Sequence, residues 1–329
     1  MISPRNSLIL LLVVAVLTLA LCPLIGMKWI PLSTILHADS SVMDANIFWK
    51  IRVPRVLTAF LAGSALAVSG MVFQAMFRNP LATPFTLGVS SGASLGAALS
   101  VTLGLGFSLF GVSATSILAF VGSSVSILLV YGLTRLRQGF STATMLLSGV
   151  AVSFFFSSLI LFLQYSAELY NSFRMLRWVM GGLGTVGYDS LLSIFPFVAT
   201  GVLLLAYVTH ELNLLVLGDD IAMSRGVDVR KTKRLLFFVT SLMVGSVVAV
   251  CGPIGFIGMM VPHICRLLGG HDHRYLIPAS LLFGGTFLTI CDTFARTVLS
   301  PAELPVGVIT AFLGGPFFVA LLLTSKERR

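Results

Sequence analysis

Residues 251–274 read CGPIGFIGMMVPHICRLLGGHDHR, and this stretch decides the fold. It is apolar enough to lie in a membrane, yet Pro253, Pro262 and several glycines interrupt it, and His263 and Arg266 lie at membrane depth. Helix breakers and ionisable groups are tolerated inside a bilayer only where protein or a water-filled cavity covers them. The stretch is therefore typical of the inner lining of a transport protein.

The composition of the whole chain supports a membrane protein. Its 329 residues are 57% hydrophobic and only 10% charged, whereas a soluble domain carries about 25% charged residues. A membrane span needs roughly 20 apolar residues. Ten spans are predicted, at 7–27, 51–77, 84–106, 112–134, 142–165, 190–210, 235–251, 254–269, 277–298 and 304–324. We expect an all-α polytopic membrane protein with a single transmembrane domain over residues 1–329.

The net charge of +9 raises the question of nucleic acid, but the distribution of the charge indicates a topology signal. With ten spans, both termini lie on one side of the membrane, and that side receives 14 of the 21 basic residues. Basic residues are enriched in cytoplasmic loops. Both termini are therefore expected in the cytoplasm, in contact with membrane lipid and with no nucleic-acid partner.

The four cysteines lie inside or beside apolar spans, in no spacing that indicates a disulfide framework. They are Cys22, Cys251, Cys265 and Cys291. The sequence LTLALC before Cys22 resembles a lipoprotein cleavage site, but Leu21 occupies the position where a small residue is required. We therefore expect residues 7–27 to remain as the first span.

The second span carries basic residues at its outer mouth and small residues along its length. Arg52 and Arg55 precede a run that contains Gly63, Ser64 and Gly70. Small residues let helix backbones approach closely, so this helix is predicted to be central. Tight packing and pore lining both explain the pattern, and the two are compatible.

Two segments outside the spans have helical spacing. Apolar residues recur at that spacing in NSFRMLRWVMGGLG, residues 171–184, which predicts a short helix on the outer surface. On the inner side, residues 210–234 keep apolar faces, and Gly218 and Gly226 punctuate two short helices. A solvated connection needs no such alternation, so this segment is predicted to dock a cytoplasmic partner.

No motor, metal site or catalytic group is predicted within the chain. The nearest approach to a nucleotide-binding loop has Arg230 where the second glycine is required, so the chain is predicted to be no enzyme. His263 and Cys265 could join His271 and His273 as zinc ligands, but residues two apart on a helix lie about 200° from each other. No metal ligand is therefore assigned.

One ionisable pair lies inside a predicted span. Asp292 and Arg296 are four residues apart on the ninth span, where they could pair along one helix face. A proton relay would use such residues. A structural ion pair is the favoured interpretation.

Several motifs together resemble the FecCD-type permease family of ABC importers. They are RVPR at 52–55, SGxxxQxxxRNPLAxPxxLG at 69–88, GPIGFIGxxVPHxxR at 252–266, GxDHR at 270–274, DxxAR at 292–296 and ELPVGVITAxLGxPxFxxLL at 303–322. The resemblance runs from about residue 50 to 324. It implies the type II ABC importer permease fold, with ten helices in two inverted five-helix repeats, here about 1–188 and 189–324.

The resemblance also implies the partners and the sites. The partners would be a second permease copy in a homodimer, two cytoplasmic subunits that bind ATP and Mg, and a periplasmic or lipid-anchored substrate-binding protein. Arg52, Arg55 and Arg296 match docking positions for the binding protein. Asn79, Leu81, Ser141 and Thr142 match the cytoplasmic gate. Leu217, Gly218, Ala222 and Gly226, within a coupling segment at 211–233, match the surface that meets the ATPases.

The predicted function is ATP-driven import of a metal chelate (an iron–siderophore, haem or cobalamin) across a bacterial inner membrane. No cofactor is predicted in this chain itself. The alternative is an ion-coupled secondary transporter that uses Asp292, His263 and Arg266.

Overall fold

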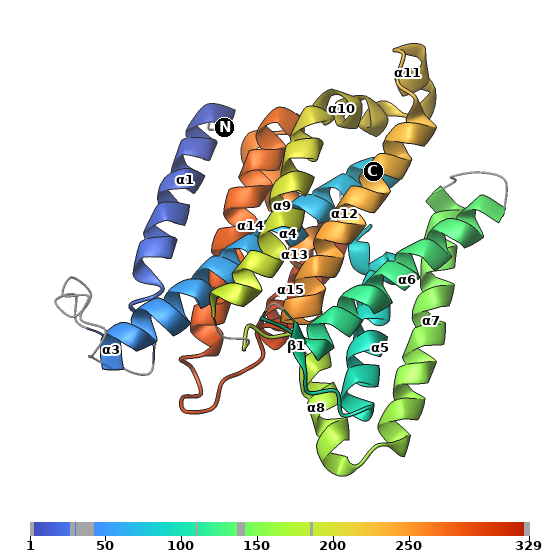
Figure 1. Ribbon diagram of the computed structural model, residues 1–329. Coiled ribbons are helices and arrows are strands. Elements are labelled where there is room, and N and C mark those ends of the chain that lie inside the picture. Colours follow the sequence, from blue (N-terminus) through green and yellow to red (C-terminus); the bar gives the residue numbers. More distant parts are fainter. Residues whose placement is uncertain are drawn as a thin grey trace.

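The computed structural model describes residues 3–26, 30, 43–109, 111–136, 142–184 and 187–325. Apart from one short antiparallel hairpin, β1 (Ser108–Leu109) and β2 (Val112–Ser113), the regular structure of this part is helical (Figure 1). The longer helices are α1 (Pro4–Leu21), α4 (Val53–Phe77), α5 (Val89–Thr102), α6 (Ala114–Leu136), α7 (Thr142–Ser166), α9 (Tyr188–Tyr207), α12 (Val229–Cys251), α13 (Ile257–Gly269), α14 (His273–Ala295) and α15 (Val306–Ser325). Each of the ten predicted spans coincides with one of them.

Short helices connect the long ones. They are α3 (Met43–Asn46), the π-helical turn η1 (Ile47–Arg52), the 3₁₀ turn η2 (Pro84–Leu87), α8 (Leu169–Val179), α10 (Thr209–Leu217) and α11 (Asp219–Ser224). Among the described residues, seven helices are long and apolar enough to cross a membrane. The shorter α13 begins only at Ile257, because the glycine- and proline-rich residues 252–256 interrupt the helix before it.

Helix α4 is the centre of the molecule. It packs against α9, α12, α13 and α14, and nearly all of its residues are buried. Glycine makes this packing possible, since a Cβ on Gly63 would overlap the backbone of Gly284 in α14 and a Cβ on Gly70 would overlap Gly258 in α13. The predicted central position of this helix is confirmed.

Helix α7 has the opposite character. It is as apolar as α4, but only a small share of its residues is buried. Phe154, Phe155, Leu161 and Phe162 are all exposed on it. Since a soluble surface would not carry such a face, α7 faces lipid or another apolar partner.

The connecting elements gather at two ends of the bundle. The N-terminus, α10, α11, the end of α6 and the start of α7 lie at one end, which is uppermost in Figure 1. Helices α3 and α8 and the loop between α14 and α15 lie at the other. Following the predicted topology, we call these the inner end and the outer end.

Candidate functional site

Arg55 is the centre of a buried ion-pair network at the outer end. Its Nε and Nη2 donate to the two carboxylate oxygens of Asp292 on α14, at 2.9 to 3.2 Å. Its Nη1 donates to Glu303, in the loop before α15, at 2.9 and 3.2 Å. Asp292 is 1% exposed and Glu303 is 41% exposed. One guanidinium therefore binds a permanently covered carboxylate and a solvent-accessible one, in the bidentate geometry that arginine favours.

The other two predicted docking arginines are also turned inward. Arg296 Nη2 donates to the carbonyl oxygen of Cys22 at 2.9 Å, and its Nε lies 3.7 Å from Asp292. Arg52 Nη1 donates to the carbonyl oxygens of Pro23 and Leu24 at 3.2 and 3.1 Å. These bonds tie the end of α1 to α4 and α14.

The structure thus brings Arg52, Arg55 and Arg296 together at the outer end, but it buries all three. The predicted Asp292–Arg296 structural pair is confirmed, and Arg55 is its larger partner. Sequence reasoning did not single out Glu303. Its only signal was a carboxylate at the start of the ELPVG motif.

The predicted gate residues lie where helices end at the inner side. Arg78 closes α4 in the left-handed conformation (φ 50°), and the Leu81 N–H then donates to Asn79 Oδ1 at 2.9 Å. Leu81 is 39% exposed. Thr142 is the first residue of α7. Ser141 lies outside the described residues.

The predicted coupling segment consists of two short helices, as expected. Gly218 separates α10 from α11 with φ 133°, and Gly226 follows α11 with φ 84°. Leu217 is exposed, whereas Ala222 is fully buried against the bundle. The segment therefore has one face toward the protein and one toward solvent.

Four contacts fasten α10 and α11 to the helices α14 and α12. Asn213 on α10 donates from Nδ2 to Asp272 at 2.8 Å and accepts from the backbone N–H and Nδ1 of His273 at 3.0 and 2.7 Å. Because a carboxamide oxygen only accepts, Nδ1 of His273 carries the hydrogen. Lys233 on α12 binds Asp219 on α11 at 2.6 Å.

The polar residues before α14 have a definite role in this contact. Asp272 caps α14 by accepting from the backbone N–H of Arg274. This hydrogen bond, followed by the one from Asn213, lowers the pKa of Asp272. The carboxylate therefore stays ionised and holds the end of α14 and α10 together.

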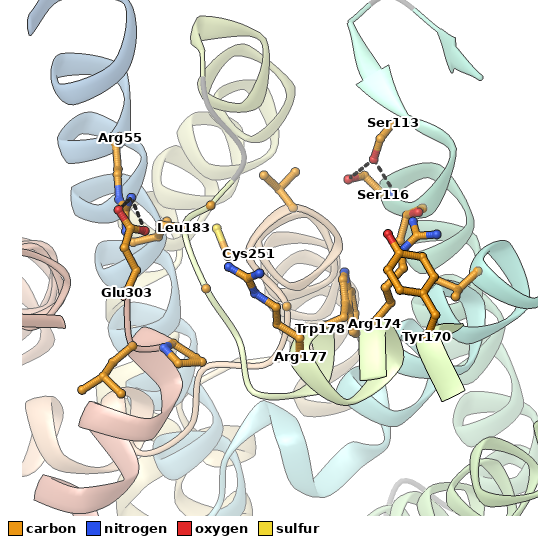
Figure 2. Close-up of a pocket in the computed structure, with 18 residues that line it drawn as sticks. Arg55, Ser113, Ser116, Tyr170, Arg174, Arg177, Trp178, Leu183, Cys251 and Glu303 are labelled. Carbon is orange, nitrogen blue, oxygen red and sulfur yellow. Dashed lines mark hydrogen bonds and ion pairs between the residues drawn. The ribbon is translucent and has the colours of Figure 1, made fainter. Parts of the chain in front are cut away.

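The stretch that decided the fold lines a cavity at the outer end. Residues 252–256 are non-helical, with φ 66° at Gly252 and 69° at Phe256. The Cys251 carbonyl accepts from the Gly182 N–H at 2.7 Å, and Cys251 and Gly252 line a cavity of about 510 Å³ together with Arg55, Glu303 and residues of α8 (Figure 2). We call this space the outer cavity. Cys251 and Gly252 are the residues of the stretch 251–274 that line this cavity, and the lining of a transport pathway by the whole stretch stays a prediction.

The ionisable residues of α13 have protein partners. Arg266 donates to the side chain of the buried Gln74 on α4. The His263 ring packs edge-on against Phe317 of α15, with 5.8 Å between centroids. Across the described residues, no group of three histidine, cysteine or acidic side chains is arranged to hold a metal ion.

The chain resembles known transport proteins over nearly its whole length. The model of the FecCD transport family matches residues 10–324. The Vitamin B12 import system permease protein BtuC of Klebsiella pneumoniae subsp. pneumoniae is 39% identical over 97% of this chain and 93% of its own. The Hemin transport system permease protein HmuU of Yersinia pestis is 38% identical over 88% of both chains.

A solved structure extends the likeness to three dimensions. It is described as an inward-facing conformation of a metal-chelate type ABC transporter. It superposes with a TM-score of 0.87 at 30% identity and covers 97% of this chain and 99% of its own.

Proposed function

This chain belongs to the FecCD transport family, and from that premise we propose that it is the permease subunit of an ATP-driven importer for a metal chelate. It is a multi-pass membrane protein with the fold of type II ABC importer permeases. It is a transport subunit and not a catalytic enzyme. The chelate would be an iron–siderophore, haem or cobalamin, carried from the periplasmic or outer side into the cytoplasm.

One observation carries the proposed mechanism: α10 of the coupling segment packs against α4, the helix that leads into the proposed gate. A Cβ on Gly218 would stand 3.5 Å from Nη1 of Arg78, and Arg78 directly precedes Asn79. A partner that moves α10 and α11 would therefore move the chain that leads into the gate at Asn79, Leu81, Ser141 and Thr142. ATP and Mg would be bound by two cytoplasmic partner subunits.

The outer arginines support a second part of the proposal. A substrate-binding protein would dock with acidic residues on the outer end near Arg52, Arg55 and Arg296. Of the two carboxylates that bind Arg55, Glu303 is exposed and Asp292 is buried. Glu303 is therefore the partner that an incoming carboxylate can replace. Both termini would lie in the cytoplasm, and a second copy of the chain would complete a homodimer in the inner membrane.

The alternative of an ion-coupled carrier gains no support from the site. Asp292 would have to bind and release the coupling ion, but Arg55 engages both of its oxygens. Arg266 is likewise bonded to Gln74.

The experiment that tests the proposal is reconstitution of the permease with its ATPase and binding protein in liposomes. We expect uptake of at least one of three chelates (ferric siderophore, haem or cobalamin) that requires internal ATP and persists without an ion gradient. Uptake that follows a proton or sodium gradient and ignores ATP would establish the carrier instead.

A further inference from the structure

Most of the side chains that line the outer cavity have no role in the mechanism proposed above. It lies between α8, the start of α6, residues 182–184, the end of α12 and residues 303–305 (Figure 2). Its volume of about 510 Å³ falls within the range of small-molecule sites, about 300 to 1,000 Å³. The space is therefore large enough for a ligand and not only for a single side chain.

Two arginines of α8 border this cavity and have no carboxylate partner among the described residues. Arg174 and Arg177 are three residues apart, so they lie on one face of the helix, and both are exposed. Within the described part of the chain neither forms an ion pair, although Arg174 lies over the ring of Tyr170 at 5.8 Å. Across the cavity, Arg55 is already engaged by two carboxylates.

The charge balance of the walls follows from these contacts. Glu303 is the one carboxylate among the described lining residues. It belongs to a network in which the two positive charges of Arg55 and Arg296 balance the two negative charges of Asp292 and Glu303. Arg174 and Arg177 therefore leave the cavity with two uncompensated positive charges. Asp189 borders a smaller, adjoining cavity and not this one.

The remaining lining groups suit a planar or aromatic anion. Tyr170 and Trp178 contribute aromatic side chains, and Ser113 and Ser116 contribute hydroxyl groups that are 3.0 Å from each other. Guanidinium forks bind carboxylates and other planar oxyanions through paired hydrogen bonds. An amphipathic ligand with anionic oxygens at one edge could bind the arginines through those oxygens and contact the aromatic side chains with its apolar part.

We propose that the outer cavity is a binding site for an anionic metal chelate, whose carboxylate or catecholate oxygens are held by Arg174 and Arg177. The chelate meets this site at the outer end before it reaches the interior of the bundle. The proposal rests on the proposed function and narrows its substrate class to chelates that carry negative charge.

The test is direct binding to the permease–ATPase complex in nanodiscs without the binding protein. The probes are ferric citrate, haem and a ferric tris-catecholate, with ferrioxamine E, a ferric tris-hydroxamate with no net charge, as comparison. Quenching of tryptophan fluorescence reports binding, and Trp178→Phe identifies the signal from the cavity. We expect saturable quenching by at least one anionic probe, with its Kd raised at least tenfold in the R174Q/R177Q variant.

Two control variants separate charge from geometry. Lys50→Gln removes an exposed positive charge at the outer end away from the cavity, and it should leave the Kd unchanged. The R174K/R177K variant keeps the charge without the fork and should bind with intermediate affinity. Size-exclusion profiles and ATPase activity show that each variant is folded.

Three results would overturn the inference. The first is that no anionic probe binds saturably, and the second is that R174Q/R177Q binds as tightly as the parent. The third is that the double variant loses affinity for the binding protein but not for the chelate, which would make the cavity a protein-docking site. ATP-driven uptake, measured in the same preparations, separates these results from a failure of the proposed function itself.

Discussion

At the scale of single residues, Arg55 connects the rigid and the exchangeable parts of the outer end. Asp292 holds it from within the bundle, whereas Glu303 holds it from an exposed loop. Glu303 is accessible to solvent although Arg55 is buried. A carboxylate from a docking protein can therefore replace Glu303, at the cost of one partly exposed ion pair, about 1 kcal/mol. Replacement of Asp292 would leave a buried charge without a partner and is far more costly.

The first prediction concerns this exchange. Glu303→Gln removes the competing carboxylate while Asp292 keeps Arg55 in place. We expect the affinity for the substrate-binding protein to rise up to about fivefold. The parent permease must break the Arg55–Glu303 ion pair before it docks, and the variant need not. Surface plasmon resonance at two salt concentrations measures it, and the gain should shrink at high salt.

Asp189→Asn provides the control, since it removes an exposed outer carboxylate outside this network. A Glu303→Gln variant that binds like the parent would show that Arg55 is not a docking residue. Reversal of Arg55 itself is a poorer test, because it would also break the buried pair.

The second prediction concerns Asn213, which joins α10 to the start of α14. Asn213→Ala removes the bonds to Asp272 and His273 and should lower stability by about 1 kcal/mol. We expect the complex to assemble and hydrolyse ATP but to transport less chelate per ATP, because α10 is no longer fastened to α14. The ratio of uptake to hydrolysis in proteoliposomes measures it.

Ser224→Ala is the matched control, since that hydroxyl bonds only within α11. Normal coupling in Asn213→Ala would assign the Asn213 cluster a purely structural role.

At the scale of elements, the packing of α4 against α13 and α14 depends on glycine pairs. Helix backbones in a membrane gain little from the hydrophobic effect, so close van der Waals contact holds them together. The Gly70–Gly258 and Gly63–Gly284 contacts leave no space for a side chain.

The third prediction follows from this packing. Gly70→Ala places a methyl group against the backbone of Gly258 and should cost about 1–3 kcal/mol. We expect a lower melting temperature for the purified permease in detergent. Fluorescence-detected size-exclusion chromatography after heating measures it. Gly132→Ala on α6, where nothing lies within 4 Å of the new methyl group, should leave the melting temperature unchanged or higher. Equal melting of the two variants would contradict the close contact.

The fourth prediction concerns the break between α10 and α11. Gly218 has φ 133°, and a branched residue there is strained by about 1–3 kcal/mol. Gly218→Val should therefore shift α11 relative to α10, leaving membrane insertion intact but uncoupling ATP hydrolysis from uptake. Gly106→Val, in open space at the outer end, is the control. Normal uptake per ATP in Gly218→Val would place the coupling element elsewhere.

At the scale of the whole molecule, one chain leaves a large apolar face on α7. The gate residue Thr142 begins this same helix. If a second copy covers α7, the two Thr142 residues lie near the twofold axis, and the gate is shared between subunits.

The fifth prediction tests this arrangement. Cysteine in place of Thr142 should cross-link two subunits in the resting state and block transport, and reduction should restore it. The native Cys22, Cys251, Cys265 and Cys291, all buried, are first replaced so that the signal is clean. Gel mobility of the dimer and chelate uptake are measured together. Absence of cross-linking in every nucleotide state would move the gate away from this axis.

The sequence by itself determined the class, the spans and the family of this protein. Apolar runs of span length can be read directly from the order of residues, and every predicted span contains a helix. The surface helix α8 and the two helices around Gly218 were also predictable, because apolar spacing and glycine breaks act over a few residues. The motifs at 252–266 and 303–322 pointed to the FecCD family, whose model matches residues 10–324.

Only the tertiary structure decided which charges are partnered. Arg55, Asp292 and Glu303 are far apart in the chain, and local sequence does not specify a contact between separate helices. The same is true of Asn213 with His273, and of the outer cavity, whose lining residues come from seven separate segments. Ion pairing depends on distance in space and on exclusion of water. The sequence therefore placed Arg174, Arg177 and Arg55 alike on the outer side. Only the fold shows that Arg55 binds two carboxylates, whereas Arg174 and Arg177 form no ion pair with any described residue.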